Sequence, residues 1–254
     1  MIGPLRARLS QGYRTGNYPE TVPELPERYR GLPALDPEKC AAGCGACADV
    51  CPTGAVSTAS GKAALDMGRC LFCGECAAAC PPRALTFTRE HRLASHGREG
   101  LTVAGADWRQ DAGRRGEELR RLFGRSFRLR QVSAGGCNAC EADTNVLGTL
   151  VFDLGRFGIQ FVASPRHADG ILVTGPVSRN MEGALLKTYE AVPDPKVVIA
   201  VGACAVSGGA YAGHDEVVPG GVGALLPVDL WVPGCPPHPL TILDGLLRLI
   251  GRVR

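Results

Sequence analysis

This chain of 254 residues lacks the sequence features of membrane-spanning, nucleotide-binding and exported proteins. No segment holds 18 uninterrupted apolar residues, so we expect no transmembrane helix. The G-x-x-x-x-G-K-[ST] motif of P-loop nucleotide sites is absent as well. The start of the chain lacks an apolar signal core and a twin-arginine pair, so we expect it to stay in the cytoplasm. A net charge of +3 is too small to indicate a nucleic-acid partner.

Cysteine, in contrast, is abundant, with twelve residues. In a reducing compartment cysteines serve as metal ligands more often than they form disulfides. Eight of them fall in residues 40–80 and four in residues 137–235, which leaves none over. The economical interpretation is three metal sites with four thiolates each.

The first eight cysteines form a repeat in which each run ends in Cys-Pro. The first run consists of Cys40, Cys44, Cys47 and Cys51, and the second of Cys70, Cys73, Cys76 and Cys80. The second run matches the bacterial [4Fe-4S] ferredoxin pattern C-x2-C-x2-C-x3-C-P. In that pattern three closely spaced thiolates bind one cluster, and the fourth reaches the neighbouring cluster. We therefore predict one cluster on Cys40, Cys44, Cys47 and Cys80, and another on Cys70, Cys73, Cys76 and Cys51.

The first run departs from the ferredoxin pattern at one spacing. Three residues separate Cys40 from Cys44, where the pattern has two. A one-residue bulge over residues 41–43 would still allow Cys40 to bind the first cluster. The alternative is that Cys40 does not reach this cluster, which would then be labile or contain three iron atoms. Zinc is a weaker alternative, because zinc sites use two C-x2-C pairs, whereas these quartets share ligands and contain no histidine.

The second half of the chain alternates strand-like and helical patterns. We expect strands at 127–132, 159–163, 170–174, 197–201 and 228–232, and helices at roughly 141–154, 180–192 and 238–250. This alternation predicts an α/β flavodoxin-like domain with about five parallel strands. Cys137 with Cys140, Cys204, and Cys235 each follow one of these strands, and such sheets bind ligands at the carboxyl ends of their strands. The four thiols should therefore converge on a third metal site.

The chain divides into four parts on these patterns. They are an extended N-terminal docking segment (1–36), a small α+β ferredoxin domain with two clusters (37–88), an Arg-rich linker (89–126) and the flavodoxin-like domain (127–254). Leu5 and Leu9 share one face of a short basic helix, which either docks on a partner, frays, or contacts a membrane surface or membrane subunit. The linker interleaves its arginines with acids and has no aromatic platform, which argues against nucleic-acid binding. We expect it to join two domains and to cover a partner surface.

Several short runs resemble a known family. In the second half they are residues 136–141 (GCNACE), 164–169 (SPRHAD), 173–177 (VTGPV), 201–204 (VGAC) and 232–237 (VPGCPP). They resemble the small subunit of membrane-bound, energy-converting [NiFe] hydrogenases of the formate hydrogenlyase type, a family homologous to the complex I subunit that holds the terminal cluster. In the first half, residues 29–33 (YRGLP) and 68–74 (GRCLFCG) resemble the two-cluster ferredoxin subunit of the same complexes. The chain thus resembles a fusion of two neighbouring subunits.

This resemblance implies cluster ligands at Cys137, Cys140, Cys204 and Cys235, and hence three [4Fe-4S] clusters in all. It implies an oxidoreductase subunit that relays electrons between a reductant module, such as formate or CO dehydrogenase, and a [NiFe] site on a separate large subunit. Membrane subunits are further implied partners, with the chain peripheral on the cytoplasmic face of the inner membrane.

Two alternatives to hydrogenase stay open. One is the equivalent subunit of a complex I-like quinone- or ferredoxin-linked dehydrogenase without nickel, and the other is a stand-alone polyferredoxin carrier. The complex I subunit has adjacent cysteines at the first ligand position, whereas two residues separate Cys137 from Cys140, which is similar to the hydrogenase pattern. A simple carrier would not need a large α/β domain around one cluster.

Glu141 directly follows the second predicted ligand of the third cluster and has two interpretations. An acidic residue in the first turn of a helix is stabilised by the helix dipole. Alternatively, Glu141 is catalytic: it reaches the large-subunit interface and passes protons to or from the catalytic metal. Partial burial beside a cluster is expected to raise its pKa, which would suit proton transfer near neutrality. The resemblance, in which an acidic residue follows the second cysteine, supports the catalytic interpretation.

Overall fold

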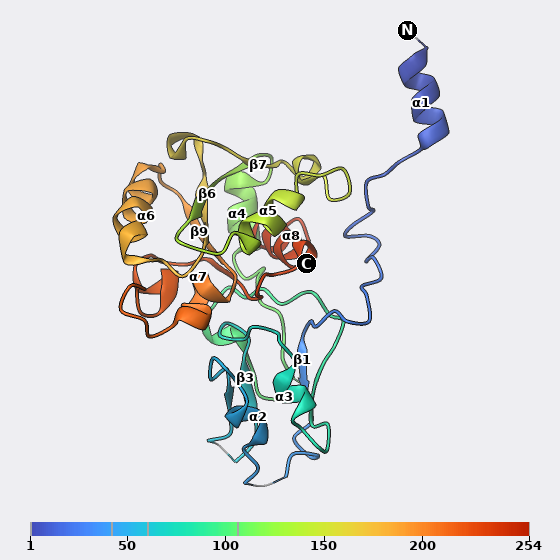
Figure 1. Cartoon of the computed structure of the whole chain (residues 1–254). Helices are drawn as coiled ribbons and strands as arrows, with labels where there is room; N and C mark the ends of the chain where they lie inside the picture. Colours follow the sequence, from blue (N-terminus) through green and yellow to red (C-terminus); the bar gives the residue numbers. More distant parts are fainter. Residues whose placement is uncertain (1, 42, 60, 106, 254) are drawn as a thin grey trace.

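The computed structural model describes residues 2–41, 43–59, 61–105 and 107–253. Figure 1 shows a smaller folded part, a larger part built around a sheet, and helix α1 (Gly3–Gln11) projecting away from both. No residue of α1 is buried. Among the described residues, no helix has both the length and the apolar character needed to span a membrane.

The smaller part contains two antiparallel sheets and two short helices. Strand β1 (Pro33–Leu35) pairs with β4 (Leu85–Phe87), and β2 (Val56–Ser57), β3 (Ala64–Asp66) and β5 (Thr102–Val103) form a three-stranded sheet. The helices are α2 (Ala46–Asp49) and α3 (Glu75–Ala78), and each carries the third cysteine of one run. This repeat of a short helix within each cysteine run, together with the small antiparallel sheets, confirms a small α+β ferredoxin-like fold.

The larger part is built on five parallel strands. They are β6 (Phe127–Ser133), β7 (Ile159–Phe161), β8 (Gly170–Thr174), β9 (Val197–Val201) and β10 (Leu230–Val232), in the order β10-β9-β8-β6-β7. Numbered along the chain, this order reads 5-4-3-1-2, which is the flavodoxin-like topology. Strands β8 and β9 are buried along their whole length, which is why their sequences are continuous apolar runs. The predicted flavodoxin-like domain is therefore confirmed.

Helices cover both faces of this sheet. They are α4 (Gly116–Phe123), α5 (Ala139–Val146), α6 (Arg179–Ala191), α7 (Ala203–Ser207) and α8 (Pro239–Leu249). The 3-10 turns of the larger part are η2 (Leu154–Phe157), η3 (Pro165–His167), η4 (Gly209–Tyr211) and η5 (Gly221–Ala224), whereas η1 (Glu99–Leu101) directly precedes β5 of the smaller part. In Figure 1, α4, α5 and α8 lie on one side of the strands, and α6 and α7 on the other. The core on the α7 side continues into the smaller part, since one buried apolar cluster contains both Val206 and Leu65.

The prediction of a helix at 141–154 is wrong at its C-terminal end, because the observed helix is shorter. Helix α5 ends at Val146, and the chain turns through Gly148 and through Asp153, which has a positive φ of 47°. Leu150 and Val151 continued the apolar periodicity, but both are exposed in the structure. They extended the helical pattern without belonging to a buried face.

Residues 89–126 join the two folded parts and also belong to both. Strand β5 completes the sheet of the smaller part, whereas Ser95 forms an antiparallel bridge with Trp231 in β10. Leu93 and Leu101 are almost fully buried. These apolar residues between the arginines make the segment a packed connection. Position 106 lies outside the described residues.

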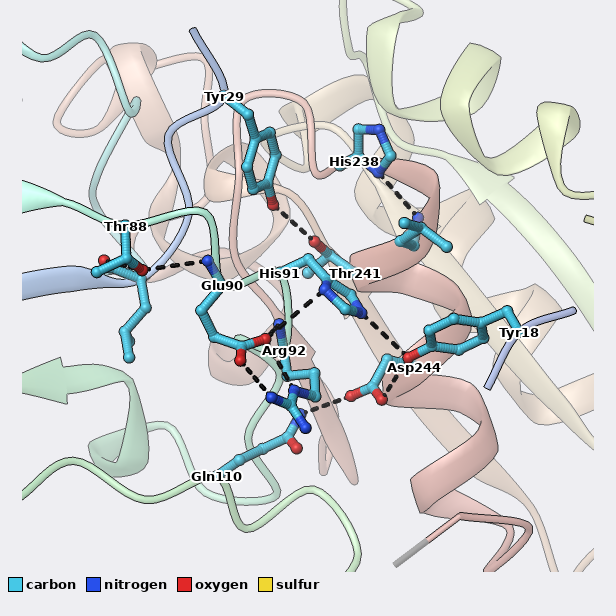
Figure 2. A network of polar contacts seen from close by, with 12 residues as sticks. Tyr18, Tyr29, Thr88, Glu90, His91, Arg92, Gln110, His238, Thr241 and Asp244 are labelled. Atoms are coloured by element: carbon cyan, nitrogen blue, oxygen red, sulfur yellow. Dashed lines mark hydrogen bonds and ion pairs between the residues drawn. The ribbon is translucent and has the colours of Figure 1, made fainter. Parts of the chain in front are cut away.

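A buried polar network attaches the N-terminal segment to α8 (Figure 2). The Tyr18 hydroxyl donates to Asp244 Oδ1 at 2.7 Å and lies 3.1 Å from His91 Nε2. Asp244 Oδ2 accepts from Gln110 Nε2 at 2.8 Å and from Arg248 Nε at 2.9 Å. Asp244 is only 1 % exposed, so these donors replace the water that its carboxylate loses. The segment is thereby held against the larger part.

Candidate metal centres

Three of the four cysteines of the first predicted quartet line one small hollow in the smaller part. Cys40, Cys47 and Cys80 line it, and Cys80 comes from the second cysteine run, as the crossed assignment requires. Burial, and then the charges of Cys80 and Cys40, raise the pKa of the Cys47 thiol. Cys40 therefore reaches its partners despite the extra residue in its spacing. Cys44 is exposed. Of the bulge expected over residues 41–43, residue 42 lies outside the described part of the chain.

The second predicted quartet lines a second small hollow. Its four thiols are those of Cys51, Cys70, Cys73 and Cys76, so here too one cysteine crosses from the other run. Burial, and then the neighbouring thiols, raise the pKa of Cys70 to about 12 and that of Cys76 to about 11. Cys51 is also partly buried, but N–H groups directed at its sulfur, with Ala55 N at 3.2 Å, lower its pKa. Such donors also stabilise a thiolate bound to metal.

The third predicted quartet lies at the carboxyl edge of the five-stranded sheet. Cys137 and Cys140 follow β6, Cys204 lies on α7 after β9, and Cys235 follows β10. Burial, and then the charges of Cys204, Glu141, Cys235 and Cys137, raise the pKa of the Cys140 thiol to about 12. The four thiols thus lie near enough to interact electrostatically, at the sheet edge where the strand pattern led us to expect them.

Two glycines leave room for the sulfur atoms of this third quartet. A Cβ atom on Gly202, whose φ is +92°, would lie 2.5 Å from Cys140 Sγ. A Cβ atom on Gly209, whose φ is +57°, would lie 2.8 Å from Cys204 Sγ. Any side chain at either position would collide with a predicted ligand. The sequence prediction did not include Gly209, although the Gly208-Gly209 pair shortly after Cys204 is a recognisable signal for close backbone approach.

The donor chemistry of all three quartets fits an iron–sulfur cluster. Each set consists of thiols alone, and cysteine thiolates are the ligands of [4Fe-4S] clusters. Over the residues that the structure describes, no three His, Cys, Asp or Glu side chains are grouped closely enough to hold a single metal ion. Because burial raises the pKa values of Cys70 and Cys140 to about 12, binding a cluster must displace protons from these two thiols.

Glu141 faces the interior of the chain and is 6 % exposed. Its Oε1 accepts hydrogen bonds from Ser133 Oγ at 2.5 Å and from Thr174 Oγ1 at 2.8 Å. Burial raises the pKa of this carboxyl, but the two hydroxyl donors and a backbone N–H act in the opposite direction, and the pKa is lowered overall. The expected rise in pKa is therefore wrong. Ser133 and Thr174 end neighbouring strands, β6 and β8, and only their pairing in the sheet brings them to Glu141.

The fold and the thiol sites define an iron–sulfur protein with a two-cluster ferredoxin part and a flavodoxin-like part. Comparison with known families agrees: residues 32–81 match the 4Fe-4S dicluster domain, and residues 137–249 match the NADH ubiquinone oxidoreductase, 20 Kd subunit.

Three relatives show where this similarity extends. Formate hydrogenlyase subunit 7 of Escherichia coli (strain K12) is 44 % identical over 128 residues, which are 50 % of this chain and 49 % of the relative. The probable membrane-bound hydrogenase subunit mbhJ of Pyrococcus furiosus is 40 % identical over 136 residues, 54 % of this chain and 81 % of the relative. An NADH-quinone oxidoreductase subunit of Heliobacterium modesticaldum is 42 % identical over 122 residues, 48 % of this chain and 69 % of the relative.

The chain belongs to the family of the NADH ubiquinone oxidoreductase 20 Kd subunit, whose members include subunits of hydrogenases and of quinone oxidoreductases. It spans about half the length of the Escherichia coli relative. The ferredoxin part lies on the same polypeptide, as the resemblance to a fusion of two subunits implied.

Proposed function

We propose that this chain is the iron–sulfur electron-transfer subunit of a membrane-associated [NiFe] hydrogenase complex. It relays electrons between a reductant module, such as a formate or CO dehydrogenase, and a [NiFe] site on a separate large subunit. This proposal rests on one observation: a single folded chain contains two ferredoxin quartets that exchange one cysteine each, and a third quartet at the edge of the five-stranded sheet. The position is peripheral, on the cytoplasmic face of the inner membrane, with membrane subunits as partners.

All twelve cysteines are the proposed ligands of three [4Fe-4S] clusters. When bound, each cluster supplies one-electron transfer. The chain itself holds the thiols in place and shields them, since Cys47, Cys70 and Cys76 are almost fully buried. Exclusion of water and N–H donors to sulfur are the means by which a protein tunes cluster potentials.

The contacts between the two folded parts support an order for the relay. The loop before Cys70 touches α7, which carries Cys204, through a hydrogen bond between Ser207 Oγ and the Gly68 carbonyl at 3.0 Å. The second quartet is therefore the neighbour of the third. The first quartet, whose Cys44 is exposed, then takes the entry end of the relay; Cys73 of the second quartet is exposed too, so this order rests on the contact between Ser207 and Gly68.

A complex I-like dehydrogenase without nickel is the second candidate, because a quinone oxidoreductase subunit is as similar to this chain as the hydrogenase subunits are. The two-residue separation of Cys137 and Cys140 favours hydrogenase.

Anaerobic purification of the native complex through a tag on this chain distinguishes the two candidates. The hydrogenase proposal predicts a copurifying large subunit that contains nickel, and reduction of the clusters on this chain by hydrogen gas. A large subunit without nickel, together with cluster reduction by a quinol or ferredoxin but not by hydrogen, would overturn it in favour of the second candidate.

A further inference from the structure

The loop that leads from β3 to Cys70 lies against α7, on the side of the larger part that faces the smaller one (Figure 1). Gly68 is two residues before Cys70, and Ser207 is three residues after Cys204. The Ser207 hydroxyl is shared between two carbonyl acceptors, that of Gly68 at 3.0 Å and that of Ala203 at 3.0 Å. A single side chain therefore connects two backbones that carry cysteines of different quartets.

Gly68 allows this close approach because it has no side chain. A Cβ atom at this position would lie 2.7 Å from Val206 Cγ1 and 2.7 Å from Arg98 Cζ. Val206 lies on α7 and is 1 % exposed, so it has no free space into which it can move. Any residue other than glycine would therefore push α7, and Cys204 with it, away from the loop.

Arg98 also holds this loop. Its Nη1 and Nη2 donate to Asp66 Oδ1 at 2.8 Å and Asp66 Oδ2 at 2.6 Å. Asp66 Oδ1 also accepts from the backbone N–H of Gly68 at 2.8 Å, and the N–H of Met67 donates to the Leu101 carbonyl at 2.9 Å. A two-pronged arginine–carboxylate pair fixes orientation as well as distance. The loop is thereby held to the connecting segment, whose Ser95 forms the bridge with Trp231 of the larger part.

We propose that Gly68, Ser207 and Arg98 act as a spacer that sets the separation of the second and third thiol quartets. They are positioning residues, and none of them is a predicted ligand. The spacer controls how strongly the clusters on those two quartets interact, because both magnetic coupling and electron exchange weaken with distance. This inference rests on the proposed function, since it requires both quartets to hold clusters.

The test compares Gly68→Ala with Gly183→Ala in the whole chain, assembled with clusters under anaerobic conditions. Gly183 is a matched control, because its added Cβ would meet nothing within 4 Å. Two properties are measured: iron per chain, and the electron paramagnetic resonance spectrum of the reduced protein, in which neighbouring clusters split or broaden each other's signals. We expect both variants to keep the iron of the unmodified chain. Gly68→Ala should lose the splitting between the second and third clusters, and Gly183→Ala should keep it.

A spectrum of Gly68→Ala that matches the control would overturn the spacer and leave the proposed function intact. If Gly68→Ala loses iron, Ser207→Ala decides, because it removes one hydroxyl and adds no atom. Reduced splitting with full iron content in Ser207→Ala supports the spacer, and unchanged splitting refutes it. An unmodified chain with fewer than three clusters would overturn both the spacer and the proposed function, and its iron content would reveal that outcome first.

Discussion

Phenylalanine in place of Tyr18 removes one hydroxyl from the buried network of Figure 2 and leaves the aromatic ring. That hydroxyl is the donor to Asp244 Oδ1 at 2.7 Å and the neighbour of His91 Nε2 at 3.1 Å. A hydrogen bond to a charged group contributes about 2 kcal/mol, and its loss here leaves a buried carboxylate oxygen with one donor fewer. At 1.4 kcal/mol for each factor of ten, the segment around Tyr18 should open about 30 times more often.

Amide hydrogen exchange at Gly16 measures this opening, because its N–H donates to the Val151 carbonyl at 2.8 Å and must separate from it to exchange. Tyr13→Phe is the matched control, since Tyr13 is 79 % exposed and the same atom is removed. We expect faster exchange at Gly16 in Tyr18→Phe and unchanged exchange in Tyr13→Phe. Equal rates in the two variants would refute the reasoning that the network holds the N-terminal segment in place.

Four further outcomes follow from the geometry. Cys204→Ala should remove one cluster, so that iron falls from about twelve to about eight per chain at four per cubane, and the ferredoxin signals should persist. Gly202→Ala should destroy the same cluster, because the new Cβ would collide with the sulfur of Cys140, although all four ligands are kept. A full iron content in this variant would contradict the prediction. Glu141→Gln should keep all three cluster signals, since an amide oxygen still accepts hydrogen bonds from the two hydroxyls. A collapse of hydrogen activity in the assembled complex would show that the carboxylate transfers protons. Unchanged activity would show that Glu141 only fastens α5 to the sheet. Burial lowers the pKa of His91 in the native chain. At pH values between that lowered pKa and the ordinary value near 6.5, the unfolded chain therefore binds a proton that the native chain does not. Native stability should therefore fall as the pH falls through this window, and His91→Gln should show a smaller fall in denaturant titrations.

The grouping of the cysteines and the parallel sheet were predictable because their signals are local in the sequence. Continuous apolar runs such as 170–174 and 197–201 occur where a strand is buried on both faces, and the structure has strands over those same residues. The meeting of Cys51 with Cys70 also follows from local spacing, because the ferredoxin pattern crosses one ligand between its two runs.

The environments of single side chains were not predictable, because they depend on residues distant in the sequence. Tyr18 and Asp244 are 226 positions apart, and nothing near either one indicates the other. The pKa of Glu141 was expected to rise because burial was foreseen, whereas the donors Ser133 and Thr174 become its neighbours only through strand pairing. The spacer glycine, Gly68, carries no sequence signal beyond its place before Cys70.

The iron and zinc content of the whole chain, prepared under anaerobic conditions, tests the central claim most directly. Three [4Fe-4S] clusters on twelve cysteines require about twelve iron atoms per chain and no stoichiometric zinc. Iron near eight per chain, or zinc in proportion to the protein, would show that at least one quartet does not hold the cluster assigned to it.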